Sequence, residues 1–119
     1  MADYVKVFQY QGEVSLILGV EDDRILALGQ KLEAICPEAY MNGYNWDALL
    51  RYYLEKNAPE ILEGMDPDPE AGMYEAHWPL TPENEAKAKR FEDIIRSLIE
   101  NEEELCRIVK EEGSGIEWD

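Results

Sequence analysis

The chain has 119 residues, a length typical of one domain, and 45% of them are hydrophobic, which is enough to form a substantial core. Eleven basic residues against 27 acidic ones give a formal net charge of −16. This charge disfavours nucleic acid and anionic membranes as partners and favours a basic protein, although solubility alone would also account for it. We expect a single domain over residues 1–119. We expect it in the cytoplasm, because the sequence shows neither a signal peptide nor an apolar run of about 20 residues.

The N-terminal third predicts a hairpin followed by a helix. Residues 5–10 and 13–18 are two short β-prone runs around Gln11-Gly12, which suits a tight turn. The acidic residues 21–23 then favour a helix N-terminus, and the helix stops before Pro37. Its apolar stripe consists of Ile25, Leu28, Leu32 and Ile35.

A second helix is predicted after the turn at Asn42-Gly43-Tyr44, with Asn45 as its N-cap. Its inward face consists of Trp46, Leu49, Leu50, Tyr53 and Leu54. Two prolines and a glycine in residues 66–72 predict an acidic loop without regular structure. Residues 73–78 predict a third strand, which would pair with the hairpin.

The last third predicts helix. Thr81 suits an N-cap and Pro82 the first helical position, and apolar stripes follow at 91–99 and 105–109. Asn101 lies between the stripes, so residues 83–112 form either one helix or two. Gly113-Ser114-Gly115 suits a flexible linker that begins a tail over 113–119. The tail is either flexible or docked through Trp118, on its own domain or on a second copy. The element order β-β-α-α-β-α(-α) predicts an α+β fold, in which helices pack on one face of a small three-stranded antiparallel sheet.

The residues that carry chemistry are few. His77 is the only histidine, which excludes sites that need two, and Cys36 and Cys106 form no CxxC pair, so we expect them to be reduced core residues. The acidic loop lacks the glycine and terminal glutamate of a calcium-binding EF-hand loop, and the sequence contains no nucleophile elbow or phosphate loop. We therefore predict no catalytic residue, no metal and no cofactor. A small enzyme with carboxylates in a cleft is the alternative.

Two tyrosines and a group of acidic residues favour a partner-binding surface over a catalytic site. Tyr44 and Tyr52 fall outside the apolar stripes, and aromatic side chains often anchor interfaces. Asp66, Asp68 and Glu70 cluster in the acidic loop. We predict that these five residues contact the partner.

Two sequence stretches resemble a family of bacterial immunity proteins from polymorphic and contact-dependent toxin systems. They are Gly43-Tyr44-Asn45-Trp46 with Leu49-Leu50-Arg51-Tyr52-Tyr53-Leu54 after it, and Asp66-Pro67-Asp68-Pro69-Glu70-Ala71-Gly72-Met73-Tyr74. The resemblance covers roughly residues 13–78. It implies a non-catalytic cytoplasmic protein that binds and neutralises a cognate toxin domain, without specifying the toxin's activity or the oligomeric state.

The charge agrees with that resemblance. Many toxins are nucleases, which are basic because they hold nucleic acid, and an acidic inhibitor would meet them with a complementary field. The alternative is an acidic nucleic-acid mimic or an adaptor for another basic protein.

Overall fold

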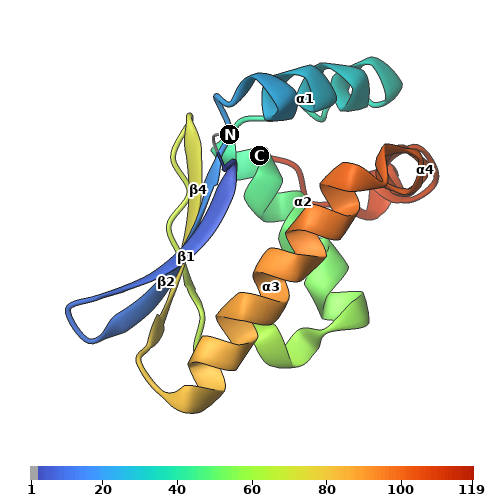
Figure 1. Ribbon diagram of the computed structural model, residues 1–119. Helices are drawn as coiled ribbons and strands as arrows, with labels where there is room; N and C mark the ends of the chain where they lie inside the picture. The colour runs from blue at the N-terminus through green and yellow to red at the C-terminus, as the bar shows by residue number, and fades with distance from the viewer. Residues whose placement is uncertain (1–2) are drawn as a thin grey trace.

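The computed structural model describes residues 3–119 and shows an α+β fold. Helices α2 and α3 cover one face of an antiparallel sheet, and α1 and α4 pack against each other at one end (Figure 1). The strands are β1 (Val5–Tyr10), β2 (Glu13–Gly19), β3 (Asp66–Pro67) and β4 (Met73–Pro79). The α-helices are α1 (Asp23–Ile35), α2 (Gly43–Asn57), α3 (Pro82–Glu100) and α4 (Glu102–Glu112), with 3-10 turns η1 (Pro59–Leu62) and η2 (Gly113–Gly115).

Within residues 3–119 the sheet has four strands in the order β1-β2-β4-β3, one more than the sequence predicts. The predicted hairpin and third strand are confirmed. The extra strand, β3, lies in the segment that the sequence predicts to be an irregular loop, and it pairs Asp66 with His77 and Pro67 with Ala76. Pro67 is compatible with this position because an edge strand needs hydrogen bonds on one side only.

Side-chain alternation gives the sheet two different faces. Val14, Leu16 and Leu18 of β2 point toward the helices and are buried, as are three residues of β4: Tyr74, Ala76 and Trp78. The indole N–H of Trp78 donates to the carbonyl oxygen of Ile61 at 3.0 Å, so this large buried ring also satisfies its polar group. The intervening residues of β2 and β4 point to the opposite face, away from α2 and α3.

The start of α2 differs from the prediction. Asn42, not Asn45, is the N-cap, and its side chain accepts a hydrogen bond from the backbone N–H of Asn45 at 3.0 Å. Asn45 lies inside the helix and is 2% exposed. Its amide donates to the carbonyl of Tyr40 at 2.7 Å, and its oxygen accepts from the backbone N–H of Asp119 at 2.6 Å. The sequence favours either asparagine as a cap, and tertiary contacts give Asn45 a different role.

The C-terminal region forms two helices and an attached tail. Asn101 ends α3, and its side chain accepts from the backbone N–H of Glu104 at 3.4 Å to cap α4, so the alternative of two helices is the correct one. Of the alternatives open for the tail, packing against its own domain is the one that the structure shows. Ile116 is buried, and the indole N–H of Trp118 donates to the carbonyl of Gly113 at 3.0 Å.

One buried charge lies on α3. Glu92 is 7% exposed and accepts hydrogen bonds from Lys89 at 2.8 Å and Arg96 at 3.1 Å. Burial by itself raises the pKa of Glu92, but these two cations outweigh it, so the pKa lies below its ordinary value. Within residues 3–119, no helix is long and apolar enough to cross a membrane.

Candidate partner-binding site

The first turn of α2 is seated directly on the loop before β4. The backbone N–H of Gly43 donates to the carbonyl of Ala71 at 3.0 Å. A side chain at Gly43 would overlap the carbonyl oxygens of Glu70 and Met73, so only glycine fits this close approach of two backbone segments. The contact fixes where α2 begins and leaves the next residue, Tyr44, 41% exposed at the surface.

A groove of about 440 Å³ runs between α2 and the C-terminal tail. The helix contributes Tyr44, Asp47, Ala48, Arg51, Tyr52 and Glu55, and the tail contributes Gly115, Glu117, Trp118 and Asp119. The two sides are held together by the hydrogen bond between Asn45 and the backbone of Asp119. The groove therefore depends on the docking of residues that are far apart in sequence.

The groove is acidic. Among the described residues, Arg51 is the only basic one that lines it, and it donates to Asp47 at 2.9 Å. No Lys or Arg within residues 3–119 forms an ion pair with the exposed carboxylates of Glu55, Glu117 or Asp119. In addition, one oxygen of Asp47 is buried without a hydrogen-bond partner in the described part of the chain. Such a groove suits a cationic side chain from a partner.

Tyr52 forms a fixed wall of this groove. Its hydroxyl donates to Glu112 at 2.7 Å, and Lys56, 3.0 Å from the same carboxylate, lies 4.6 Å from the centre of the ring. The hydrogen bond from Tyr52, followed by that from Lys56, holds the pKa of Glu112 below its ordinary value. A ring that is already held in place loses little conformational entropy when a partner packs against it.

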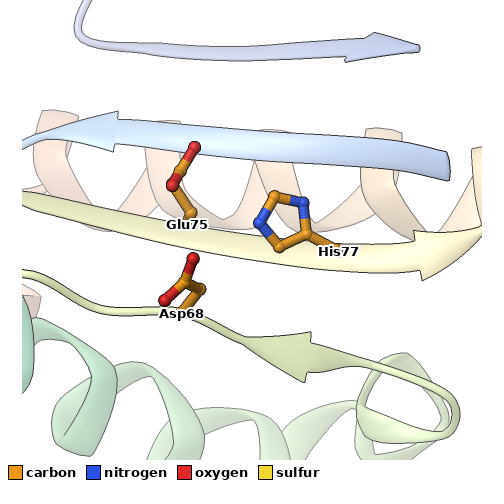
Figure 2. A group of neighbouring side chains, drawn as sticks. All are labelled: Asp68, Glu75 and His77. Atoms are coloured by element: carbon orange, nitrogen blue, oxygen red, sulfur yellow. The ribbon is translucent and has the colours of Figure 1, made fainter. Parts of the chain in front are cut away.

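A second group of chemically active side chains lies on the sheet. Figure 2 shows Glu75 and His77 projecting from β4, with Asp68 beside them on the adjacent segment. The ligand atoms of these three residues lie within 4.8 Å of one another. This group contains the single histidine.

The comparisons with known proteins identify the family. The family model described as Immunity protein 51 matches residues 5–114. The chain belongs to the Immunity protein 51 family. This match extends from β1 through α4, well beyond the stretch that carries the resemblance in the sequence analysis. Neither a search of curated proteins nor one of solved structures finds a significant match.

The five predicted contact residues of this immunity protein occupy different places. Tyr44 and Tyr52 line the groove together. Glu70 pairs with Met73 in the turn beneath the start of α2, and it lines a shallow depression with Glu21 and Asp22. Asp66 lies in β3 and Asp68 follows it at the sheet edge. The two tyrosines therefore share one surface, and the three acids lie along the sheet edge and the turn before β4.

Several residues of the two sites are absent from the prediction. Glu117 and Asp119 are missed because the sequence alone does not decide where the tail docks. Glu75 and His77 are missed as a pair, although the spacing Glu-x-His in a strand places both side chains on one face and is a usable signal. Cys36 and Cys106 are free thiols and partly buried, so they are less enclosed than core residues.

Proposed function

We propose that this immunity protein neutralises a cognate toxin domain by direct binding in the cytoplasm, without catalysis, and that the acidic groove between α2 and the tail receives a basic segment of the toxin. The observation that carries the proposal is the exposed carboxylates of Glu55, Glu117 and Asp119, which line one groove beside Tyr44 and have no cationic partner within residues 3–119. Family membership supports the general function.

The charge of the whole chain supports the same partner. A net charge of −16 produces a negative field that attracts a basic toxin over several ångströms and orients it before contact. Complementary charges mainly raise the association rate and suppress wrong partners, and salt screens them over roughly 10 Å. The proposed binding should therefore be fast and should slow markedly as salt is added.

The contact is centred on two aromatic side chains. Tyr44 is exposed at the mouth of the groove, and Tyr52 is held by Glu112 along its wall. Interfaces commonly obtain most of their affinity from a few aromatic residues surrounded by polar contacts. Asp66, Asp68 and Glu70 then form an outer acidic region, which we expect to influence the association rate more than the lifetime of the complex.

Three triple variants test the location of the site, since each removes three negative charges. The groove variant is Glu55→Gln with Glu117→Gln and Asp119→Asn, and the loop variant is Asp66→Asn with Asp68→Asn and Glu70→Gln. The control is Glu83→Gln with Glu100→Gln and Glu103→Gln, which changes exposed helical carboxylates outside the groove. Binding to the toxin domain encoded beside the immunity gene, in an inactivated form, is measured by biolayer interferometry at low and high salt.

We expect the groove variant to weaken binding by at least tenfold, which corresponds to about 1.4 kcal/mol, and the control by less than about twofold. The loop variant should slow association and leave dissociation nearly unchanged. Equal affinities for the groove variant and the control would place the toxin elsewhere on the molecule. Failure of the parent protein to bind the toxin, or to protect cells that express it, would overturn the proposed function itself.

A further inference from the structure

On the face of the sheet away from α2 and α3, three side chains of metal-ligating types lie together: Glu75 and His77 from β4, and Asp68 from the segment after β3. Antiparallel pairing places Ser15 of β2 directly opposite His77 of β4. The backbone N–H of Asp68 donates to the carbonyl of Glu75 at 2.8 Å, which continues the β3–β4 ladder and sets these two residues side by side. Residues opposite each other in such a ladder point to the same face, as Figure 2 shows for Asp68 and Glu75.

The histidine is oriented by a buried hydroxyl. Ser15 is 3% exposed, and its Oγ lies 2.7 Å from Nδ1 of His77. This hydrogen bond leaves Nε2 available, and Figure 2 shows a ring nitrogen of His77 directed toward Glu75. When Nδ1 carries the proton and donates it to Ser15, Nε2 has the free lone pair that a metal ion needs. Metal-binding histidines are typically fixed in this way by a hydrogen bond from the second ring nitrogen.

The charge around the three side chains also suits a cation. Within residues 3–119, neither Asp68 nor Glu75 forms an ion pair with a lysine or arginine. Asp66 stands opposite His77 in the β3–β4 register and adds a further negative charge nearby. Two uncompensated carboxylates this close together repel each other, and a divalent ion between them removes that repulsion.

We propose that Asp68, Glu75 and His77 bind one divalent first-row transition-metal ion, such as Zn²⁺, and that Ser15 is the positioning residue for the histidine. One imidazole nitrogen with two carboxylates favours such an ion over Mg²⁺ or Ca²⁺, which prefer oxygen ligands throughout. Ligand atoms on a tetrahedral zinc ion lie roughly 3.3 Å apart, since each bond is about 2.0–2.2 Å long. The ligand atoms of the three residues lie within 4.8 Å of one another. Rotation of the two carboxylate side chains would shorten these separations to the value for zinc, and Asp68 is exposed and therefore has room to rotate. Water completes the coordination on the solvent side.

The experiment uses the full chain after treatment with a chelator and its removal. Isothermal titration with zinc chloride should show one saturable site per chain, and Co²⁺ in its place should give a visible absorption band from a nitrogen-containing ligand set. Glu75→Gln, which preserves side-chain size, and His77→Ala should each weaken the saturable binding by at least tenfold. The triple variant Glu83→Gln, Glu100→Gln and Glu103→Gln controls for weak binding to surface carboxylates and should leave the site unchanged.

Ser15 has a test of its own. Ser15→Ala keeps all three ligands and should weaken binding by roughly 10- to 100-fold, and Ser15→Thr, which restores a hydroxyl, should recover most of it. A purely structural role for Ser15 would lower the unfolding temperature without changing the affinity for Zn²⁺. The proposal is overturned if the parent shows no saturable site, or if Glu75→Gln, shown by circular dichroism to be folded, binds Zn²⁺ as tightly as the parent. These outcomes are independent of the toxin, so they do not depend on the proposed function.

Discussion

Gly43→Ala tests how α2 is positioned against the rest of the fold. In most helices this substitution stabilises, because glycine is about 1 kcal/mol less favourable than alanine. Here the added methyl group would lie 2.9 Å from the carbonyl carbon of Glu70 and would overlap two backbone oxygens. Backbone atoms cannot rotate aside as a side chain can, so either the first turn of α2 or the loop before β4 must move.

The cost follows from the contacts that such a movement breaks. Overpacking of a close contact typically costs about 1–3 kcal/mol, and loss of the hydrogen bond between Gly43 and Ala71 adds about 1 kcal/mol. We therefore expect a loss of about 2–4 kcal/mol in the free energy of unfolding, against a total of roughly 5–15 kcal/mol for a natural domain. For a chain of this size, that corresponds to a fall of about 8–16 °C in the unfolding temperature.

Urea unfolding followed by far-ultraviolet circular dichroism measures the change, with the slope of the transition checked against that of the parent. Gly19→Ala is the matched control, because a methyl group there meets only the carbonyl of Tyr4 at 3.8 Å, an ordinary contact. The control should change stability by less than about 0.5 kcal/mol. A Gly43→Ala variant as stable as the parent, or more stable, would refute this account of the α2 contact.

Two further substitutions test the tail and the buried charge. Asn45→Ala removes the hydrogen bonds that join α2 to the chain before it and to the tail. We expect a loss of about 1–3 kcal/mol in the free energy of unfolding and faster amide hydrogen exchange over 113–119. Unchanged exchange over 113–119 would contradict the attachment of the tail through Asn45. Folding lowers the pKa of Glu92, so its contribution to stability is present above the ordinary value of 4.5 and is lost as the pH falls through the lower value of the folded protein. Glu92→Gln should accordingly lower the free energy of unfolding by about 1–2 kcal/mol near neutral pH, and this loss should shrink below pH 4.5. Asp93→Asn, a change at an exposed neighbour, is the control and should show no such trend. The free energies are measured by urea titration, and a loss for Glu92→Gln that is constant with pH would count against the charge pairing.

Local sequence patterns predict most of the helices and strands. The hairpin, most of the apolar stripe of α1 and the cap at Thr81 each depend on residues a few positions apart, so local sequence predicts them. Ile35, predicted in that stripe, is exposed at the C-terminal end of α1. The strand β3 is missed because two residues with a proline have no intrinsic preference for a strand, and only pairing with β4 makes them one. The N-cap at Asn42 is missed for a related reason, since two nearby asparagines satisfy the same local rule.

The candidate site is predicted less completely than the fold. Tyr44 and Tyr52 are eight residues apart on one helix and fall outside its predicted apolar stripe, so their common location beside the groove follows from helical geometry, although Tyr52 is partly buried. Glu117 and Asp119 reach the same groove only because the tail folds back onto α2. No local rule predicts that contact, because it depends on residues far apart in the chain, such as Asn45 and Asp119, which are 74 positions apart.

The sequence by itself determines a small acidic α+β protein with a resemblance to immunity proteins, because composition, periodicity and motif are all local or additive properties. Tertiary structure alone decides which carboxylates lie together. It joins α2 to the tail and sets Asp68 beside Glu75 and His77. The physical reason is that side chains become neighbours through strand pairing and helix packing, and both depend on free energy summed over the whole fold.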